Sequence, residues 1–141
     1  MLNSVADFVR VLEEKEVKYT FFPSEEEGRP EVIRINYTGK NGNNMTFLYF
    51  FDADGKTLSV KIVDLCKVTT EKLMDMYVTV NEINAQYRWV KLYIDKDNDI
   101  LVEGDAIVDN LTAGDECFEI LLRFLSISND IYPRLMKVLW S

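Results

Sequence analysis

The chain has 141 residues, with 24 acidic and 16 basic side chains and no histidine, so its formal net charge is −8. This charge repels a phosphate backbone, and we expect no nucleic-acid partner. The absence of imidazole removes the usual general base near neutral pH and the usual zinc ligand, so a histidine-dependent enzyme is excluded. The length, together with a hydrophobic content of 48%, predicts a single domain over residues 1–141.

The cellular compartment is suggested by three features. The longest apolar runs, such as TFLYFF at 46–51, are shorter than the roughly 18 residues that a membrane helix needs. The N-terminus lacks the basic and then apolar regions of a secretory signal. Cys66 and Cys117 lie in apolar surroundings without a metal-binding spacing, so we expect reduced core residues. We therefore expect a cytoplasmic protein with no membrane partner.

The first elements in chain order are a helix and a short extended segment. Apolar residues at helical spacing predict a helix over 3–16, capped by Asn3 or Ser4. Residues 17–22 are rich in β-forming side chains, and the polar segment 23–30 that follows is typical of an exposed loop.

Three strands should follow as an antiparallel meander. Residues 31–38, 44–52 and 57–64 carry strand-forming patterns. The pairs Asn41-Gly42 and Asp54-Gly55 stand between these segments, and such pairs favour the positive φ angles of tight hairpin turns. The order of the strands in the sheet stays open.

The strand over 44–52 is apolar on both faces. Alternate residues from Met45 to Phe51 line one face, while Leu48 and Phe50 lie on the other. We predict that Leu48 and Phe50 form a partner-binding surface, because an exposed apolar patch usually marks an interface. The alternative is that the first or last helix covers this face within the monomer.

The second half of the chain predicts a helix, a hairpin and a long helix. An apolar stripe from Leu73 that includes Tyr77 predicts a helix over 70–87. β-patterned segments at 88–95 and 99–108 predict a hairpin around the aspartates. The element order helix, four strands, helix, two strands, helix predicts an α+β fold with a mostly antiparallel sheet and three helices.

The last helix has a predicted start and an ambiguous end. Thr112 and Asp115 match a capping box in outline. Pro133 either kinks this helix or lies in the first turn of a short last helix that begins at Asn129 or Asp130.

The acidic segment DKDNDILVEGD over 95–105 resembles the start of a calcium loop. Such a loop needs Gly at its sixth position and Glu at its twelfth, but counting from Asp95 these positions hold Ile100 and Ala106. We therefore predict a hairpin turn, with no metal site and no cofactor. Glu103 and Asp105, two apart on one strand, are read as a solvated strand face rather than a catalytic pair.

Asn81 and Asn84 on the second helix are predicted to be structural polar residues. Asn84 lies on the apolar stripe, so its amide needs hydrogen-bond partners. We favour a bond to the backbone where the helix meets the following strand, and a ligand contact is the alternative.

The segment VNEINAQYRWVKLYIDKDNDILVEGDAIV and the ending SNDIYPRLMKVLWS resemble the YbjN-domain family of bacterial sensory transduction regulators. The specific resemblance covers residues 80–140 and includes Asn81, Asn84, the run Tyr87 to Lys91 and Tyr132-Pro133. The resemblance implies a fold similar to that of type III secretion chaperones. It also implies a binding module without catalytic residues.

We therefore expect a non-enzymatic interaction module, chaperone-like or regulatory, that binds a polypeptide partner through Leu48 and Phe50 and could form a homodimer. The net charge of −8 should favour basic partners. The alternative is a small-molecule or cation sensor with a pocket lined by Tyr49, Tyr77 and Trp89.

Overall fold

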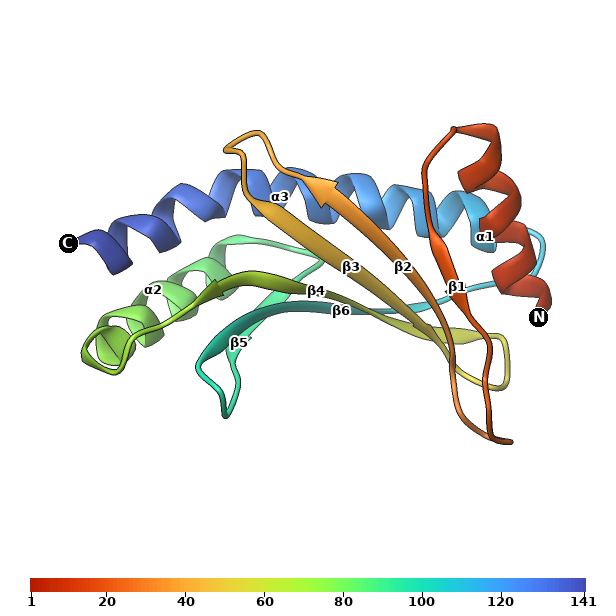
Figure 1. The fold of residues 1–141 in the computed structure, drawn as a ribbon, viewed down its shortest axis with the longest axis horizontal. Coiled ribbons are helices and arrows are strands. Elements are labelled where there is room, and N and C mark those ends of the chain that lie inside the picture. Colours follow the sequence, from red (N-terminus) through yellow and green to blue (C-terminus); the bar gives the residue numbers. More distant parts are fainter.

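The computed structural model describes residues 1–141 and contains a six-stranded sheet with three α-helices (Figure 1). The helices are α1 (Asn3–Glu14), α2 (Leu73–Gln86) and α3 (Ala113–Trp140), with a short 3-10 helix, η1 (Thr70–Lys72), before α2. The strands are β1 (Thr20–Phe22), β2 (Glu31–Thr38), β3 (Asn44–Phe51), β4 (Thr57–Lys67), β5 (Lys91–Ile94) and β6 (Asp99–Ile107). The predicted α+β class and element order are confirmed.

The sheet is antiparallel throughout and has the strand order β1-β2-β3-β4-β6-β5. The predicted meander is present as β2, β3 and β4. Gly42 and Gly55 in its two turns have φ angles of 79° and 71°, the left-handed conformation that glycine adopts without steric cost. The turn sequences therefore specify the pairing of neighbouring strands.

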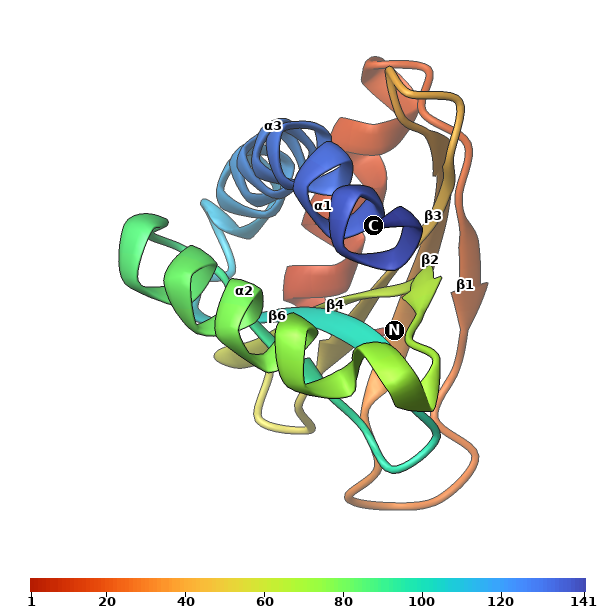
Figure 2. The same ribbon diagram turned by 90° about the vertical axis from the view of Figure 1, so that its left-hand side faces the viewer.

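The sheet bends within β4. Ile62 pairs with Val102 and Cys66 pairs with Ile100, so between these pairs β4 advances four residues while β6 advances two. Asp64 lies in this irregular segment with a φ of 63°. Such a bulge bends the strand that contains it. Figure 2 shows the sheet curving around α3.

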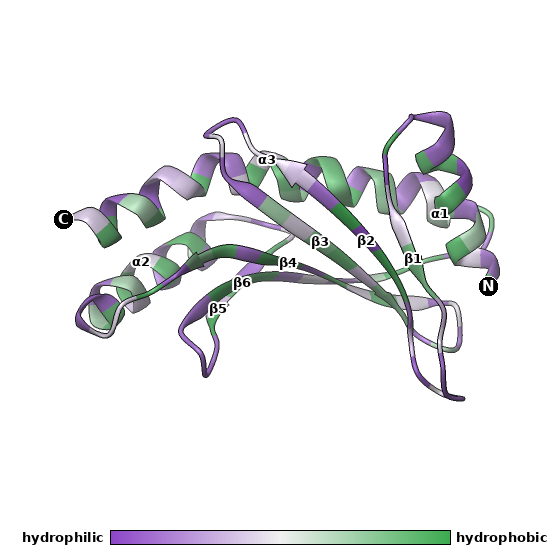
Figure 3. Ribbon diagram, in the orientation of Figure 1, coloured by the Kyte–Doolittle hydropathy of each residue, from purple (hydrophilic) through white to green (hydrophobic).

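The hydrophobic core lies between the concave face of the sheet and the helices. One cluster of 28 buried residues joins all three helices to the strands. The Phe8 ring of α1 lies 4.7 Å from the Tyr49 ring, and the Tyr49 hydroxyl donates to the backbone carbonyl of Cys117 in α3 at 2.9 Å. Figure 3 shows apolar and polar residues alternating along the helices, as expected for elements with one buried side.

The predicted caps of α1 are wrong. The N-cap residue is Leu2, and no side chain at this position accepts a hydrogen bond from the first turn. The Leu2 backbone N–H donates instead to the carboxylate of Glu31 in β2. The Ser4 hydroxyl is buried without a partner instead of capping the helix. A tertiary contact thus replaces the local cap.

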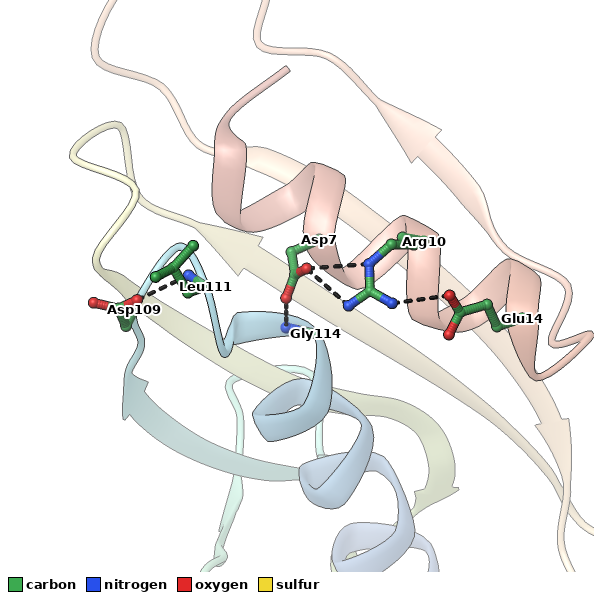
Figure 4. A network of polar contacts seen from close by, with 6 residues as sticks. All are labelled: Asp7, Arg10, Glu14, Asp109, Leu111 and Gly114. Carbon is green, nitrogen blue, oxygen red and sulfur yellow. Dashed lines mark hydrogen bonds and ion pairs between the residues drawn. The ribbon is translucent and has the colours of Figure 1, made fainter.

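The capping box of α3 is also not formed. Thr112 is the N-cap residue but makes no side-chain bond to the backbone, and its hydroxyl donates to Glu116. The N–H of Gly114 donates instead to the Asp7 carboxylate of α1 at 2.7 Å. Figure 4 shows this contact beside the ion pairs of Arg10 with Asp7 and with Glu14.

Other expectations about the helices need correction. The helix α3 runs without interruption through Pro133, so a separate helix starting at Asn129 or Asp130 is wrong. Tyr77 is 51% exposed, because α2 packs on the core through Met76, Val80 and Ile83 and leaves Tyr77 outside that stripe.

Candidate interaction surface

The outer face of the sheet, which lies opposite the helices, carries Leu48 and Phe50. Both side chains are half-buried, whereas their neighbours Phe47, Tyr49 and Phe51 are fully buried on the inner face. The first and last helices contact that inner face through Phe8 and Cys117. The alternative that one of these helices covers Leu48 and Phe50 is therefore wrong.

Cross-strand neighbours extend this apolar surface. In the ladder β2-β3-β4, Phe50 lies between Val32 and Ser59, and Leu48 lies between Arg34 and Lys61. Phe22 of β1 continues the first row beside Val32 and is 40% exposed. We call the set Phe22, Val32, Leu48 and Phe50 the outer apolar strip.

Two cations lie over the aromatic rings of the strip. The Arg34 guanidinium is 5.2 Å from the centre of the Phe22 ring, and the Lys61 ammonium is 5.7 Å from that of Phe50. The Lys61 ammonium also lies 4.0 Å from the Glu103 carboxylate. By contrast, the Nε of Arg34 is buried and has no hydrogen-bond partner. A buried donor without an acceptor is uncommon in a folded protein.

The carboxylates of β6 lie on the same outer face, where Glu103 and Asp105 line an open hollow beside Lys91. Asp105 is exposed and accepts a hydrogen bond from the Ser59 hydroxyl at 2.7 Å. Glu103 is held by the ion pair with Lys61. Neither carboxyl group is buried, so the two do not form the desolvated acid pair of a glycosidase-type site.

The acidic segment between β5 and β6 forms the predicted hairpin turn. One carboxylate oxygen of Asp95 accepts hydrogen bonds from the backbone N–H groups of Asp97 and Asp99, both at 2.9 Å. Asn98 takes a φ of 65°, which asparagine tolerates in turns. In the whole structure no group of three or more Asp, Glu or Cys side chains is placed to hold a metal ion.

Asn84 joins α2 to β5 through the backbone of Leu92. Its amide oxygen accepts from the Leu92 N–H at 2.8 Å, and its amide nitrogen donates to the Leu92 carbonyl at 3.0 Å. Asn81 lies exposed on the same helix. The two asparagines therefore differ in environment, although both were predicted as structural polar residues.

The aromatic pocket proposed for a sensor is not formed. Tyr49 is fully buried in the core, while Tyr77 and Trp89 are 51% and 56% exposed at separate places. Trp89 follows the end of α2 with a φ of 78°, and its ring lies 5.2 Å from the Arg88 guanidinium and 5.1 Å from that of Arg123. The Trp89 ring therefore lies among arginine side chains and not in an aromatic pocket.

Sequence reasoning missed a cavity of about 240 Å³ between β6 and α3. It is lined by Trp89, Gly104, Asp105, Ala106, Ile120, Arg123 and Phe124. A Cβ atom at Gly104 would lie 2.6 Å from the Phe124 ring and 2.6 Å from the Trp89 carbonyl oxygen. The glycine within a strand pattern was the available signal, because it often marks a close approach.

The two thiols are held in their protonated form. Burial is the main cause that raises the pKa of Cys66 to about 12, and the Asp99 carboxylate adds to it. Burial likewise raises the pKa of the Cys117 thiol. Both cysteines are free. Neither thiol is therefore activated as a nucleophile.

None of the helices is long and apolar enough to cross a membrane.

The geometry thus defines a small α+β protein whose distinctive surface is an uncovered sheet face. The model of the YbjN family, described as "putative bacterial sensory transduction regulator", matches residues 9–136. The chain belongs to this family.

Among solved structures, the chain is similar to YbjN from E. coli, titled a "putative transcription regulator", with 10% identity, a TM-score of 0.57 and 92% of each chain covered. It also resembles the ExoU-SpcU complex from the type III secretion system of Pseudomonas aeruginosa, with 15% identity and a TM-score of 0.45, over 92% of this chain and 95% of that chain. The first match shows the fold alone, and the second is too distant to carry an argument. No curated protein matches the chain in sequence.

Proposed function

We propose that this protein is a non-enzymatic interaction module that binds an extended segment of another polypeptide on the outer apolar strip. Membership of a family described as regulators supports a regulatory role. The observation that carries the proposal is the uncovered apolar pair Leu48 and Phe50, with the cations Arg34 and Lys61 on either side of Leu48. Apolar anchors next to a positioned polar group are typical of recognition surfaces.

The chemistry of the strip suggests what the partner contributes. Apolar side chains of the partner would pack on Leu48 and Phe50, and a carboxylate of the partner would be attracted to the Arg34 guanidinium beside Leu48. The rest of the molecule carries an excess of negative charge, so basic residues beyond the contact would speed encounter.

Photo-crosslinking from defined positions tests this proposal. A photoreactive phenylalanine analogue at position 50 would be compared in the producing bacterium with the same analogue at Ala85, an exposed position on α2. We expect a crosslinked polypeptide from position 50 that is absent from position 85 and is lost when Leu48→Asp is added. Equal crosslinking from both positions, or crosslinking that Leu48→Asp leaves unchanged, would refute the outer strip as the binding surface.

A further inference from the structure

The last residues of β6 form an open edge of the sheet. β5 pairs with β6 only from Ile94 opposite Ile100 to Lys91 opposite Glu103. β4, on the other side, pairs as far as Ile107. Residues 104–107 of β6 therefore have a neighbouring strand on one side only. Ile107 is 85% exposed.

The hydrogen-bonding pattern identifies which backbone groups face the open side. In an antiparallel ladder, successive residues direct their N–H and C=O groups to opposite sides. The Asp95 N–H donates to the Asp99 carbonyl, so the backbone N–H and C=O groups of the odd-numbered residues of β6 point toward β5. The Val108 N–H donates to the Lys56 carbonyl, so the backbone groups of the even-numbered residues point toward β4. Asp105 and Ile107 therefore direct their N–H and C=O groups to the side of β6 that β5, which pairs only as far as Lys91, does not cover.

The outward-facing backbone groups of Leu92 in β5, by contrast, have hydrogen-bond partners. Leu92 directs its N–H and C=O away from β6, and the Asn84 side chain binds both of them. The outer edge of β5 is thus closed by an amide that imitates a neighbouring strand, while the adjoining edge of β6 is left open. Unpaired edge groups of this kind are a template for another strand.

A hollow for a side chain adjoins this edge. The 240 Å³ cavity opens between β6 and α3, and a second one of about 350 Å³ lies next to it along α3. The two share Trp89, Ala106, Ile120 and Arg123 in their walls. Ala106 supplies a small side chain on the inner face of the edge, so a bulky apolar group from an added strand would have room there.

The charges around the edge indicate the kind of strand that fits. Asp115, Glu116 and Glu119 line the second cavity, and Asp105 lies on the edge itself. Arg123 is the one cation in these walls, and Glu119 already pairs with it at 3.3 Å. A second copy of this chain would bring the same carboxylates together, which is unfavourable. A basic segment is complementary.

We propose that the open edge of β6 at Asp105 and Ile107 binds an extended peptide strand that places one bulky apolar side chain in the cavity beside Trp89 and carries flanking lysine or arginine residues. Addition of a strand to a sheet edge is a known mode of peptide recognition. The site is separate from the outer apolar strip, and its existence does not depend on the function proposed for that strip.

The probe is a capped seven-residue peptide, KTVFVTK, titrated into the ¹⁵N-labelled protein. We expect shifts of the Asp105 and Ile107 amide signals, slower amide exchange at both, and a change in Trp89 fluorescence in a Trp140→Phe background. Two N-methylated peptides, each blocking the amides on one side of the strand, serve as matched controls. One of them should bind at least tenfold more weakly, and the other should bind as the parent does.

Protein variants complete the test. Ile107→Pro removes an outward N–H and should weaken binding at least tenfold, while Ile107→Thr retains it and should stay within threefold. Leu48→Asp should leave binding of the peptide unchanged, which separates this site from the outer strip. If both N-methylated peptides bind as the parent does, if the parent causes no shift at Asp105 and Ile107, or if the edge pairs with a second copy instead, the proposal is overturned.

Discussion

The carboxylate of Asp7 in α1 accepts a hydrogen bond from the backbone N–H of Gly114 in the first turn of α3, at 2.7 Å. One side chain thereby caps a helix through a residue that lies 107 positions later in the chain. The same carboxylate pairs with Arg10, which also binds Glu14 (Figure 4).

Asp7→Ala should lower the free energy of unfolding by about 1–2 kcal/mol, because the N–H at the start of α3 loses its acceptor. Glu14→Gln is the control, since it breaks only an exposed ion pair and should change stability by less than about 0.5 kcal/mol. Urea unfolding measures both. Equal effects of the two substitutions would show that the cap contributes nothing.

Asn84→Ala should lower the free energy of unfolding by about 1–3 kcal/mol, because two backbone groups of Leu92 lose their partner. Amide exchange at Leu92 should accelerate, which reports the loss at the bond itself. Asn81→Ala, on the exposed side of α2, should leave both measurements near the wild-type values. Unchanged exchange at Leu92 in Asn84→Ala would contradict the role assigned to this amide.

The two faces of β3 should respond very differently to truncation. Phe47→Ala removes a fully buried ring and should cost about 3–5 kcal/mol of stability. Phe50→Ala removes a half-buried ring from the outer face, where loss of strand propensity and cross-strand packing costs about 1 kcal/mol. Thermal or urea unfolding distinguishes them. A similar loss for both would mean that the outer face is covered in solution.

Native-state alkylation should be slow at both thiols. The pKa of Cys66 is raised from 9.0 to about 12, so at pH 8 its thiolate fraction is reduced roughly 1,000-fold relative to a free thiol. Iodoacetamide at pH 8 should therefore label neither cysteine in the native protein and both in urea, with mass spectrometry as the readout. Rapid native labelling of Cys66 would contradict this.

The same pKa shift gives a pH dependence with a definite sign. The folded state binds the Cys66 proton more tightly than the unfolded state does. The contribution of this protonated thiol to the free energy of unfolding is therefore fully present below about pH 9 and is lost as the pH rises toward 12. The Cys66→Ala variant should show a shallower loss of stability over this interval. Parallel curves for the variant and the wild type would exclude the contribution.

The sequence predicted those parts of the fold that depend on local patterns. The glycine-containing turns and the alternation along β3 were enough to place the meander, because they act through neighbouring residues. The caps were not predicted, since Asp7 and Glu31 act across the tertiary structure and no local motif records them. Tyr77 was misplaced because the face of α2 that packs on the core is narrower than its apolar stripe.

The candidate surface was predictable only in part. Leu48 and Phe50 stood out as a second apolar face, but only the positions of α1 and α3 show that no helix covers them. Gly104 was the one sequence signal for the cavity beside Trp89, whose shape depends on where β5 begins and on the left-handed conformation of Trp89.

The two extra residues of β4 near Asp64 also have a consequence for the shape of the proposed partner. They give the sheet a corner, so the strands before and after the bulge present surfaces that point in different directions (Figure 2). A straight, rigid rod such as a helix could rest on one of these surfaces but could not follow both. A flexible chain could turn the corner, so the curvature would favour, for the partner proposed above, a segment that binds without a fixed shape of its own.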